Sequence, residues 1–135
     1  MEPGDQYGFE YTVVASDSAQ LLRLAEGDEF PEVLATSRMI GLMELAAARL
    51  MRPELGEGKL SVGVSLDVTH LAATPLFERI TLRAIYQGRE ARLYRFRVEV
   101  LDAGGLVGSG THLRAIIHPD RLVESTRRRI DAANG

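Results

Sequence analysis

The sequence predicts an α+β fold in which one antiparallel sheet wraps around a single long helix. One segment has the composition of a helix. Four later segments in a row have the alternating apolar pattern of strands, as does one segment near the start of the chain. The 135 residues suit one domain, so we expect residues 1–135 to form a single domain with its own core.

The predicted helix spans residues 36–52, which are rich in Ala, Leu and Met. Thr36 and Ser37 are candidate N-cap residues, and Pro53 ends the helix. Residues 16–35 show no sustained period, and we expect them to form a loop with room for one helical turn. The helix is therefore the one strongly helical segment before the run of strands.

Strands are expected over residues 8–15, 60–71, 77–86, 91–101 and 106–117, followed by a short charged helix over residues 119–133. Turns are predicted at Gly88 and over residues 102–105. The second strand alternates, which is expected to place one row of residues on one side: Leu60, Val62, Val64, Leu66 and Val68. One sheet around one helix leaves two open edges. Pairing two copies edge to edge would cover them, so we expect a homodimer.

The composition excludes several classes of function. Nineteen acidic against sixteen basic residues, with only four Phe, four Tyr and no Trp, are not typical of a nucleic-acid-binding module. There is no cysteine, and His70, His112 and His118 lack a ligand spacing, so no metal site is expected. No apolar run approaches the ~20 residues of a membrane span, and the N-terminus lacks the features of a signal peptide. We therefore expect a cytoplasmic protein that binds neither nucleic acid nor membrane.

Two ionisable residues occupy positions where apolar residues are expected. On a helical wheel, Glu44 falls beside the apolar stripe and away from the arginines of the helix. His70 continues the alternation of its strand and points to the same side as the apolar row. Each also has an ordinary interpretation, as a carboxylate at a wet edge or a histidine satisfied by a backbone carbonyl. On two elements that must pack together, the pair is a candidate for proton transfer.

Thr36 lies at the start of the predicted helix, where free N–H groups and the positive end of the helix dipole favour a developing oxyanion. Its hydroxyl can cap the helix, orient a water molecule or act as a nucleophile, and capping is the commonest of these roles. The functional hypothesis requires Thr36, Glu44 and His70 to meet, within one chain or across two protomers.

The most specific motif of the chain is a spacing of three residues. Thr36 is followed by Glu44 after eight residues and by His70 after a further twenty-six. This spacing is accompanied by further motifs in residues 33–36, 61–63, 68–75 and 108–114. Over most of residues 9–117, the sequence resembles the fluoroacetyl-CoA thioesterase-like branch of the hotdog-fold acyl-CoA thioesterases.

The resemblance implies a hotdog fold, an antiparallel sheet of five to six strands wrapped around one long central helix, in a homodimer with thioester sites at its interface. It implies Thr36, Glu44 and His70 as catalytic residues, and Phe30, Gly63 and Arg114 as substrate-binding residues. For Arg114, an alternating solvent-side charge remains an alternative. Gly27 stands where the resemblance leads us to expect a second bulky lid residue, which favours a larger or different acyl group. Coenzyme A would be part of the substrate, and no cofactor is implied.

We therefore expect an acyl-CoA thioesterase that hydrolyses a small or medium acyl thioester carried by coenzyme A or by an acyl carrier. The alternative is a non-catalytic acyl-CoA-binding sensor or carrier with the same dimeric fold. The joint presence of the three candidate catalytic residues favours the enzyme, because binding alone does not require all of them. A hotdog dehydratase would call for an Asp–His motif that the sequence does not contain.

Overall fold

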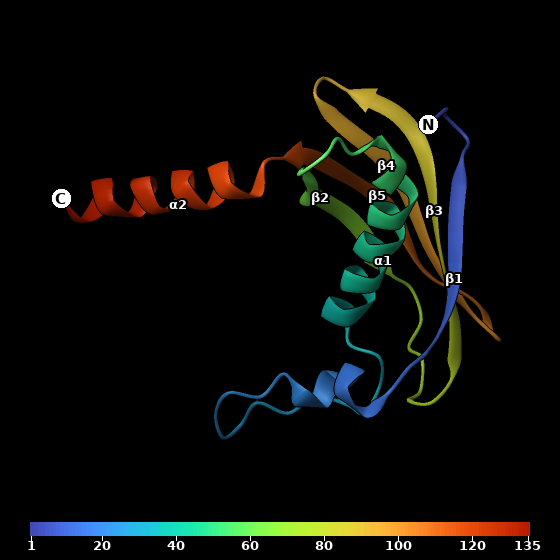
Figure 1. Cartoon of the computed structure of the whole chain (residues 1–135). Helices are drawn as coiled ribbons and strands as arrows, with labels where there is room; N and C mark the ends of the chain where they lie inside the picture. Colours follow the sequence, from blue (N-terminus) through green and yellow to red (C-terminus); the bar gives the residue numbers. More distant parts are fainter.

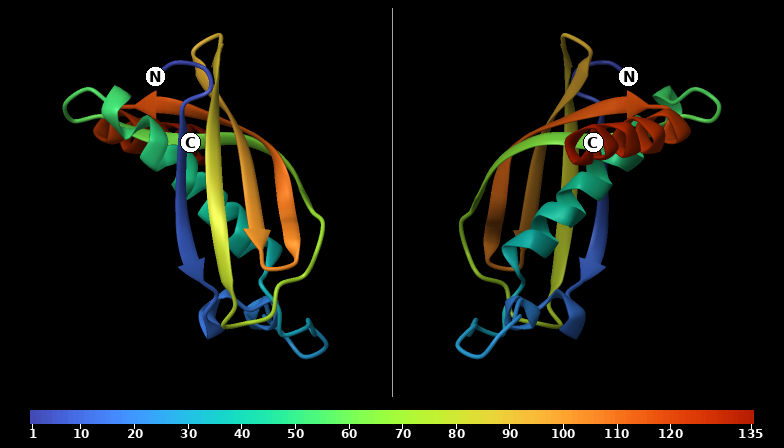
Figure 2. Two further views of the ribbon diagram at one scale, coloured as in Figure 1. Left: turned by 90° about the vertical axis from the view of Figure 1, so that its right-hand side faces the viewer. Right: turned by 90° about the vertical axis from the view of Figure 1, so that its left-hand side faces the viewer.

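The structure, a computed structural model, describes every residue of the chain. Its strands are β1 (Gln6–Thr12), β2 (Leu60–His70), β3 (Arg79–Glu90), β4 (Leu93–Asp102) and β5 (Gly105–Ile117), and its α-helices are α1 (Thr36–Met51) and α2 (Pro119–Asn134). The strands form one antiparallel sheet in the order β1-β3-β4-β5-β2. The sheet curves around α1 (Figures 1 and 2), which confirms the predicted α+β arrangement.

The core lies between α1 and the concave face of the sheet. It is built mainly from alternate residues of β3 and β4 and from one face of α1: Ile80, Leu82, Ala84, Tyr86, Phe96, Val98, Val100, Met39, Met43, Ala46, Ala47 and Met51. Burial of apolar surface is worth roughly 25 cal/mol per Å² and holds these layers together. The alternation predicted for β3 and β4 is confirmed, because both strands turn one face toward α1.

Strand β2 departs from its predicted alternation. Its pairing with β5 shifts between Gly63 and Ser65, which marks a β-bulge. The bulge reverses the phase of the side chains, so His70 points inward as predicted, whereas Leu60 and Val64 are 55% and 52% exposed. The prediction for the first half of this strand was therefore wrong.

A second register shift lies in β3, between Tyr86 and Gly88. Gly88 has a φ of 107° and sits within the strand, and the turn to β4 is made by Ala91 and Arg92 instead. The hairpin turn predicted at Gly88 was wrong by a few residues. The turn predicted over residues 102–105 is confirmed, since β4 ends at Asp102 and β5 begins at residue 105.

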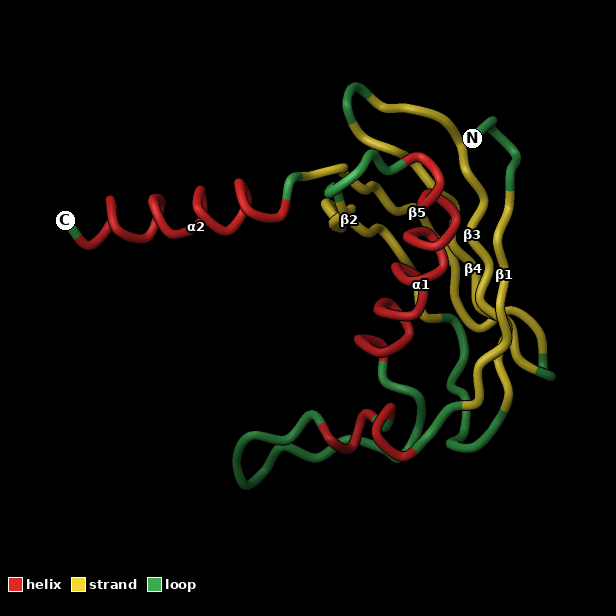
Figure 3. The backbone as a smooth tube through the Cα atoms, viewed as in Figure 1, coloured by secondary structure: helices red, strands yellow, loops and turns green.

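The segment between β1 and α1 lies at one end of the sheet (Figure 3) and contains two short 3₁₀ helices, η1 (Ala15–Asp17) and η2 (Ala19–Leu21). Helix α1 begins at Thr36 as expected, but its N-cap is Ala35 and no side chain caps it. The candidate caps Thr36 and Ser37 lie inside the helix, so the capping prediction was wrong. This leaves the Thr36 hydroxyl free for another partner.

Helix α2 projects away from the sheet and buries none of its residues (Figure 1). It has 16 residues and extends one residue beyond the predicted range 119–133, so the prediction of a charged C-terminal helix is confirmed. A third short helix, η3 (Arg52–Glu54), continues from α1. None of the helices has both the length and the apolar content that crossing a bilayer requires.

Candidate functional site

Thr36 and His70 meet at the end of the sheet where α1 begins. The Thr36 Oγ1 lies 2.8 Å from Nδ1 of His70, which is the last residue of β2. Both residues line a cavity of about 300 Å³ whose other walls are apolar. The first N–H groups of a helix have no intrahelical acceptor. A hydroxyl, an imidazole and a helix N-terminus therefore lie together.

The second ring nitrogen of His70, Nε2, is buried and has no hydrogen-bond partner. Burial lowers the pKa of His70 below its ordinary value, and the nearby backbone of Ala72 opposes this shift only in part. The ring is therefore neutral near pH 7, with one nitrogen bonded to Thr36 and the other available. Such an imidazole can exchange a proton with a group that enters the cavity.

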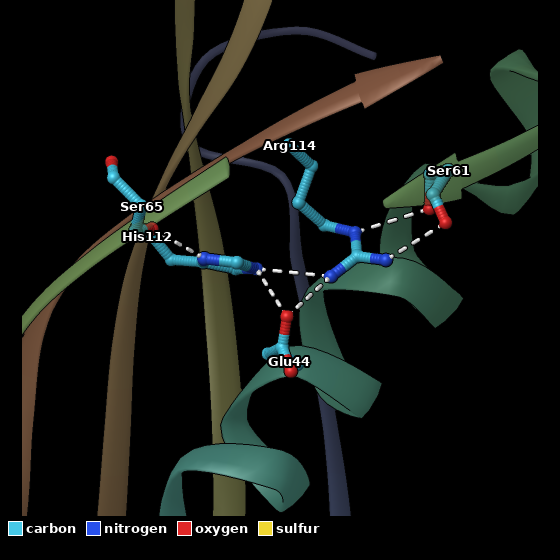
Figure 4. Close-up of polar contacts among 5 residues, drawn as sticks. All are labelled: Glu44, Ser61, Ser65, His112 and Arg114. Carbon is cyan, nitrogen blue, oxygen red and sulfur yellow. Dashed lines mark hydrogen bonds and ion pairs between the residues drawn. The ribbon is translucent and has the colours of Figure 1, made fainter. Parts of the chain in front are cut away.

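Glu44 lies about two turns further along α1, in a separate polar cluster (Figure 4). Its Oε1 is 3.3 Å from Nη1 of Arg114 and 4.0 Å from Nε2 of His112. The Glu44 side chain is 37% exposed and, with Arg114, lines a second cavity of about 250 Å³. The carboxylate is thus held by a cation on one side and is accessible on the other, as a base or a nucleophile must be.

Arg114 is almost completely buried, and each of its three guanidinium nitrogens is hydrogen-bonded to a neighbour in the cluster. Its Nε donates to Oγ of Ser61 and its Nη2 to the Ser61 carbonyl oxygen, each at 3.1 Å. Its Nη1 donates toward Glu44. Burial lowers the pKa of Arg114, and Glu44 opposes this shift. The alternative of a solvent-side charge on Arg114 is excluded.

His112 is fully buried and lies beside Arg114 and Glu44 (Figure 4). Its Nδ1 lies 2.9 Å from the Ser65 carbonyl oxygen, and its Nε2 lies 3.1 Å from Nη1 of Arg114. Because a carbonyl only accepts and a guanidinium only donates, Nδ1 carries the proton and Nε2 accepts. Burial lowers the pKa of His112, aided by the charge of Arg114. His112 is therefore a neutral acceptor that orients Arg114 toward Glu44.

Gly63 of β2 faces the carboxylate of Glu44. A Cβ at residue 63 would overlap Oε1 of Glu44 and would lie 3.2 Å from Cε1 of His112. Only a glycine lets the carboxylate occupy this position. Gly63, which the resemblance implies as a substrate-binding residue, is thus already required by the position of Glu44.

The predicted catalytic residues do not all meet within one chain. Thr36 pairs with His70, whereas Glu44 lines a different cavity with Arg114. The reason is geometric, because eight residues advance about 12 Å along a helix. Of the two arrangements left open above, a common site within one chain is therefore not formed. A meeting across two protomers stays a prediction.

Phe30 lies apart from both cavities. It is 44% exposed and lines a third, polar depression with Gln20 and Arg23. Gly27, which has a φ of 98°, has open space where a Cβ would be. The role of Phe30 as a substrate-binding residue therefore stays a prediction, and nothing bulky stands at residue 27 to narrow that end of the molecule.

The sequence reasoning missed His112 and Ser61 as members of the Glu44 cluster. One signal was available for His112, because it alternates with Arg114 and two polar residues on one face of a strand are unusual in a core. Ser61 carried no signal, since its contact depends on how β2 pairs with β5. No group of three or more His, Cys, Asp or Glu side chains is arranged to hold a metal ion.

One curved antiparallel sheet around a long helix is the architecture of the hotdog class. A hot-dog-like protein from Thermanaerovibrio acidaminovorans has the same fold, with a TM-score of 0.80 over 94% of this chain and 91% of that chain at 24% identity. The predicted hotdog fold is confirmed.

The comparison extends to one family within this class. The family model of the fluoroacetyl-CoA-specific thioesterase matches residues 14–120. The fluoroacetyl-CoA thioesterase of Streptantibioticus cattleyicolor is 37% identical over 134 residues, which cover 98% of this chain and 96% of that protein. A crystal structure of a variant of the fluoroacetyl-CoA-specific thioesterase FlK superposes with a TM-score of 0.89 at 37% identity, over 96% of this chain and 97% of that chain. The chain belongs to the fluoroacetyl-CoA-specific thioesterase family.

Proposed function

We propose that this protein is an acyl-CoA thioesterase that hydrolyses a small or medium acyl thioester. The observation that carries the proposal is the Thr36–His70 pair, whose buried Nε2 lacks a partner, in a chain of this family that also holds an accessible carboxylate. A structure of a related thioesterase variant contains fluoroacetate and CoA, which supports a CoA thioester as the substrate. An acyl group on a carrier protein presents the same bond.

The proposal includes a homodimer in which the two β2 strands pair. Strand β2 is an edge of the sheet, and Leu60, Val64 and Leu45 of α1 are apolar and exposed near it. Two β2 strands related by a two-fold axis run antiparallel, so the start of one lies near the end of the other. Glu44 lies beside Gly63, near the start of β2. In the dimer it therefore lies near the end of the partner's β2, where the partner has its own threonine–histidine pair.

In this composite site, the Thr36–His70 pair of one protomer and Glu44 of the other act on one thioester. Glu44 either removes a proton from water, whose oxygen attacks the carbonyl carbon, or attacks that carbon itself to form an anhydride that water then cleaves. In both routes the C–S bond breaks and the thiol leaves with a proton, for which His70 is the candidate donor; His70 regains this proton from the attacking water, through Glu44 in the first route and when water cleaves the anhydride in the second. Arg114 holds the carboxylate in place, and N–H groups at the start of α1 are candidates to stabilise the oxyanion.

The acyl group is the least constrained part of the proposal. Gly27 lacks a side chain at the position where the resemblance leads us to expect a second lid residue. A more open mouth suits acyl groups larger than or different from fluoroacetyl. Free-thiol release across short, branched and aromatic acyl-CoAs would identify the preferred one.

The Glu44→Gln variant tests the proposal. We expect hydrolysis of the preferred acyl-CoA to fall by at least about 100-fold, because the amide is neither a base nor a nucleophile. The dimer should stay folded, which light scattering after gel filtration and circular dichroism would check. Glu10→Gln is the matched control, since Glu10 is an exposed carboxylate paired only with Arg79 at 3.4 Å.

Two outcomes would contradict the proposal. If hydrolysis by Glu44→Gln stays within a few-fold of the original protein, the assignment of Glu44 is wrong. If the protein purifies with bound acyl-CoA yet releases no thiol, it is a sensor or carrier rather than an enzyme.

A further inference from the structure

The largest cavity of the molecule lies away from Thr36, His70 and Glu44, at the opposite end of β2 from His70. It has a volume of about 490 Å³ and is bounded by four basic side chains, Lys59, Arg89, Arg92 and His118, with Tyr94 and Ile116 among its other walls. None of its lining residues is acidic. The chain as a whole carries a formal charge of −3, so this concentration of positive charge is local.

The basic residues of this cavity are not neutralised by carboxylates. Glu90, a neighbour along the chain, pairs with Arg95 at 3.1 Å instead. Arg89 lies over the ring of Tyr94, with its guanidinium carbon 4.2 Å from the ring centre, and Nη2 donates to the Arg92 carbonyl oxygen at 3.1 Å. The guanidinium of Arg89 is thus held in place, whereas the ammonium of Lys59 and the guanidinium of Arg92 are free to bind an anion.

The cavity is adjacent to the Glu44 cluster on the same face of the sheet. Tyr94 pairs in register with Arg114 across β4 and β5, so their Cβ atoms are about 5 Å apart. Lys59 precedes Gly63 by four residues, or about 13 Å of strand. A ligand bound among the basic residues can therefore extend one arm to the carboxylate of Glu44.

Coenzyme A has the dimensions and the charge for this arrangement. Its pantetheine arm joins the thioester sulfur to the first phosphorus through thirteen bonds, which extend to about 16 Å. Its pyrophosphate and 3′-phosphate match Arg and Lys donors. In the same chain His70 follows Lys59 by eleven residues, about 36 Å of strand, and is out of reach of this arm.

We propose that the cavity formed by Lys59, Arg89, Arg92 and Tyr94 binds the phosphorylated nucleotide of coenzyme A and directs its thioester to Glu44 of the same protomer. This inference rests on the proposed function. It also assigns the Thr36–His70 pair that acts on that thioester to the partner protomer. An acyl carrier protein, which presents one phosphate and no 3′-phosphate, makes fewer contacts in this cavity.

The Lys59→Ala and Arg92→Ala variants test this site, because neither side chain forms a hydrogen bond within the chain, whereas Arg89 secures the β3–β4 turn. For the acyl-CoA that is hydrolysed fastest, we expect KM to rise about tenfold per charge removed, with kcat unchanged. KM for the N-acetylcysteamine thioester of the same acyl group should not change, since it lacks the nucleotide. The dephospho-CoA thioester should show an intermediate effect.

Arg79→Ala is the matched control, since Arg79 is an exposed arginine at the other end of β3 and pairs only with Glu10. An unchanged KM for acyl-CoA in both cavity variants, or an equal rise in Arg79→Ala, would overturn the assignment while leaving the hydrolase proposal intact. If the protein hydrolyses no thioester, the proposed function fails. The cavity assignment is then tested by itself, by measuring the binding of adenosine 3′,5′-bisphosphate with calorimetry. Weaker binding by the cavity variants than by Arg79→Ala supports it, and equal binding overturns it.

Discussion

Glu44 illustrates how a single carboxylate is positioned by residues distant in the sequence. Arg114 holds it at 3.3 Å, His112 orients Arg114, and Gly63 leaves the space that it occupies. Arg114 in turn donates two hydrogen bonds to Ser61. The buried members of this cluster have all their polar atoms paired, which is what keeps a charge close to a core from being destabilising.

The Gly63→Ala variant tests the position of this carboxylate. The added methyl group would overlap Oε1 of Glu44, so the side chain must move away from Arg114. We expect thioester hydrolysis to fall by about 100-fold, since small displacements of a catalytic group have effects of this size. Thiol release would measure it, with Gly8→Ala as the control, because residue 8 lies on the opposite edge strand. Activity of Gly63→Ala equal to that of Gly8→Ala would show that the position of Glu44 is not important.

At the scale of elements, Asp17 connects the segment before α1 to the rest of the fold. Its fully buried carboxylate accepts hydrogen bonds from the hydroxyl of Tyr11 on β1 at 2.7 Å, from the backbone N–H of Val14 at 2.8 Å and from Nε of Arg38 on α1 at 2.8 Å. Its own backbone carbonyl accepts from the N–H of Ala35, the N-cap of α1. Asp17 thereby fixes where α1 begins, and with it the position of Thr36.

We expect Asp17→Asn to lower the free energy of unfolding by about 1.5–3 kcal/mol, because an amide cannot accept all three of these hydrogen bonds. Urea denaturation would measure the loss. Asp131→Asn is the control, since Asp131 is exposed on α2 and pairs with Arg127 at 3.7 Å. A loss no larger than that of Asp131→Asn would contradict the proposed anchoring role of Asp17.

The same contact predicts a dependence of stability on pH. Burial disfavours the charged form of Asp17, but the hydrogen bonds from Val14, Tyr11 and Arg38 outweigh it and hold the pKa of Asp17 below its ordinary value. Because the pKa of Asp17 is lower in the folded state than in the unfolded state, its ionised form stabilises the fold at pH values above the unfolded pKa of about 3.9. This contribution to the free energy of unfolding is lost as the pH falls through the folded pKa. The stability difference between the original protein and Asp17→Asn should therefore shrink on acidification below about pH 4.

At the scale of the whole molecule, the separation of Glu44 from the Thr36–His70 pair makes a specific prediction for mixed dimers. Glu44→Gln and His70→Asn should each be nearly inactive alone. If each site takes Glu44 from one protomer and His70 from the other, a mixed dimer has one site with both residues intact. Random mixing in equal amounts would then restore about a quarter of the original activity.

This experiment distinguishes a shared site from one contained in a single chain. In the latter case every site of a mixed dimer lacks one residue, and co-expression of the two variants under different tags would restore no thiol release. Co-expression of Glu44→Gln under both tags gives the background rate of thiol release. Restoration would also demonstrate the homodimer, which stays a prediction until then.

The sequence alone determined the architecture and half of the candidate site. Periods of two and of about 3.6 residues are local, so they located α1, β3, β4 and the core, and they placed His70 inward on the end of β2. Only the tertiary structure decided the rest. The bulge at residues 63–65, the burial of Arg114 and His112, and the distance of Glu44 from Thr36 depend on how β2 pairs with β5 and on where α1 crosses the sheet. Register and packing join residues about 50 to 70 positions apart, and no local pattern in the chain encodes such contacts.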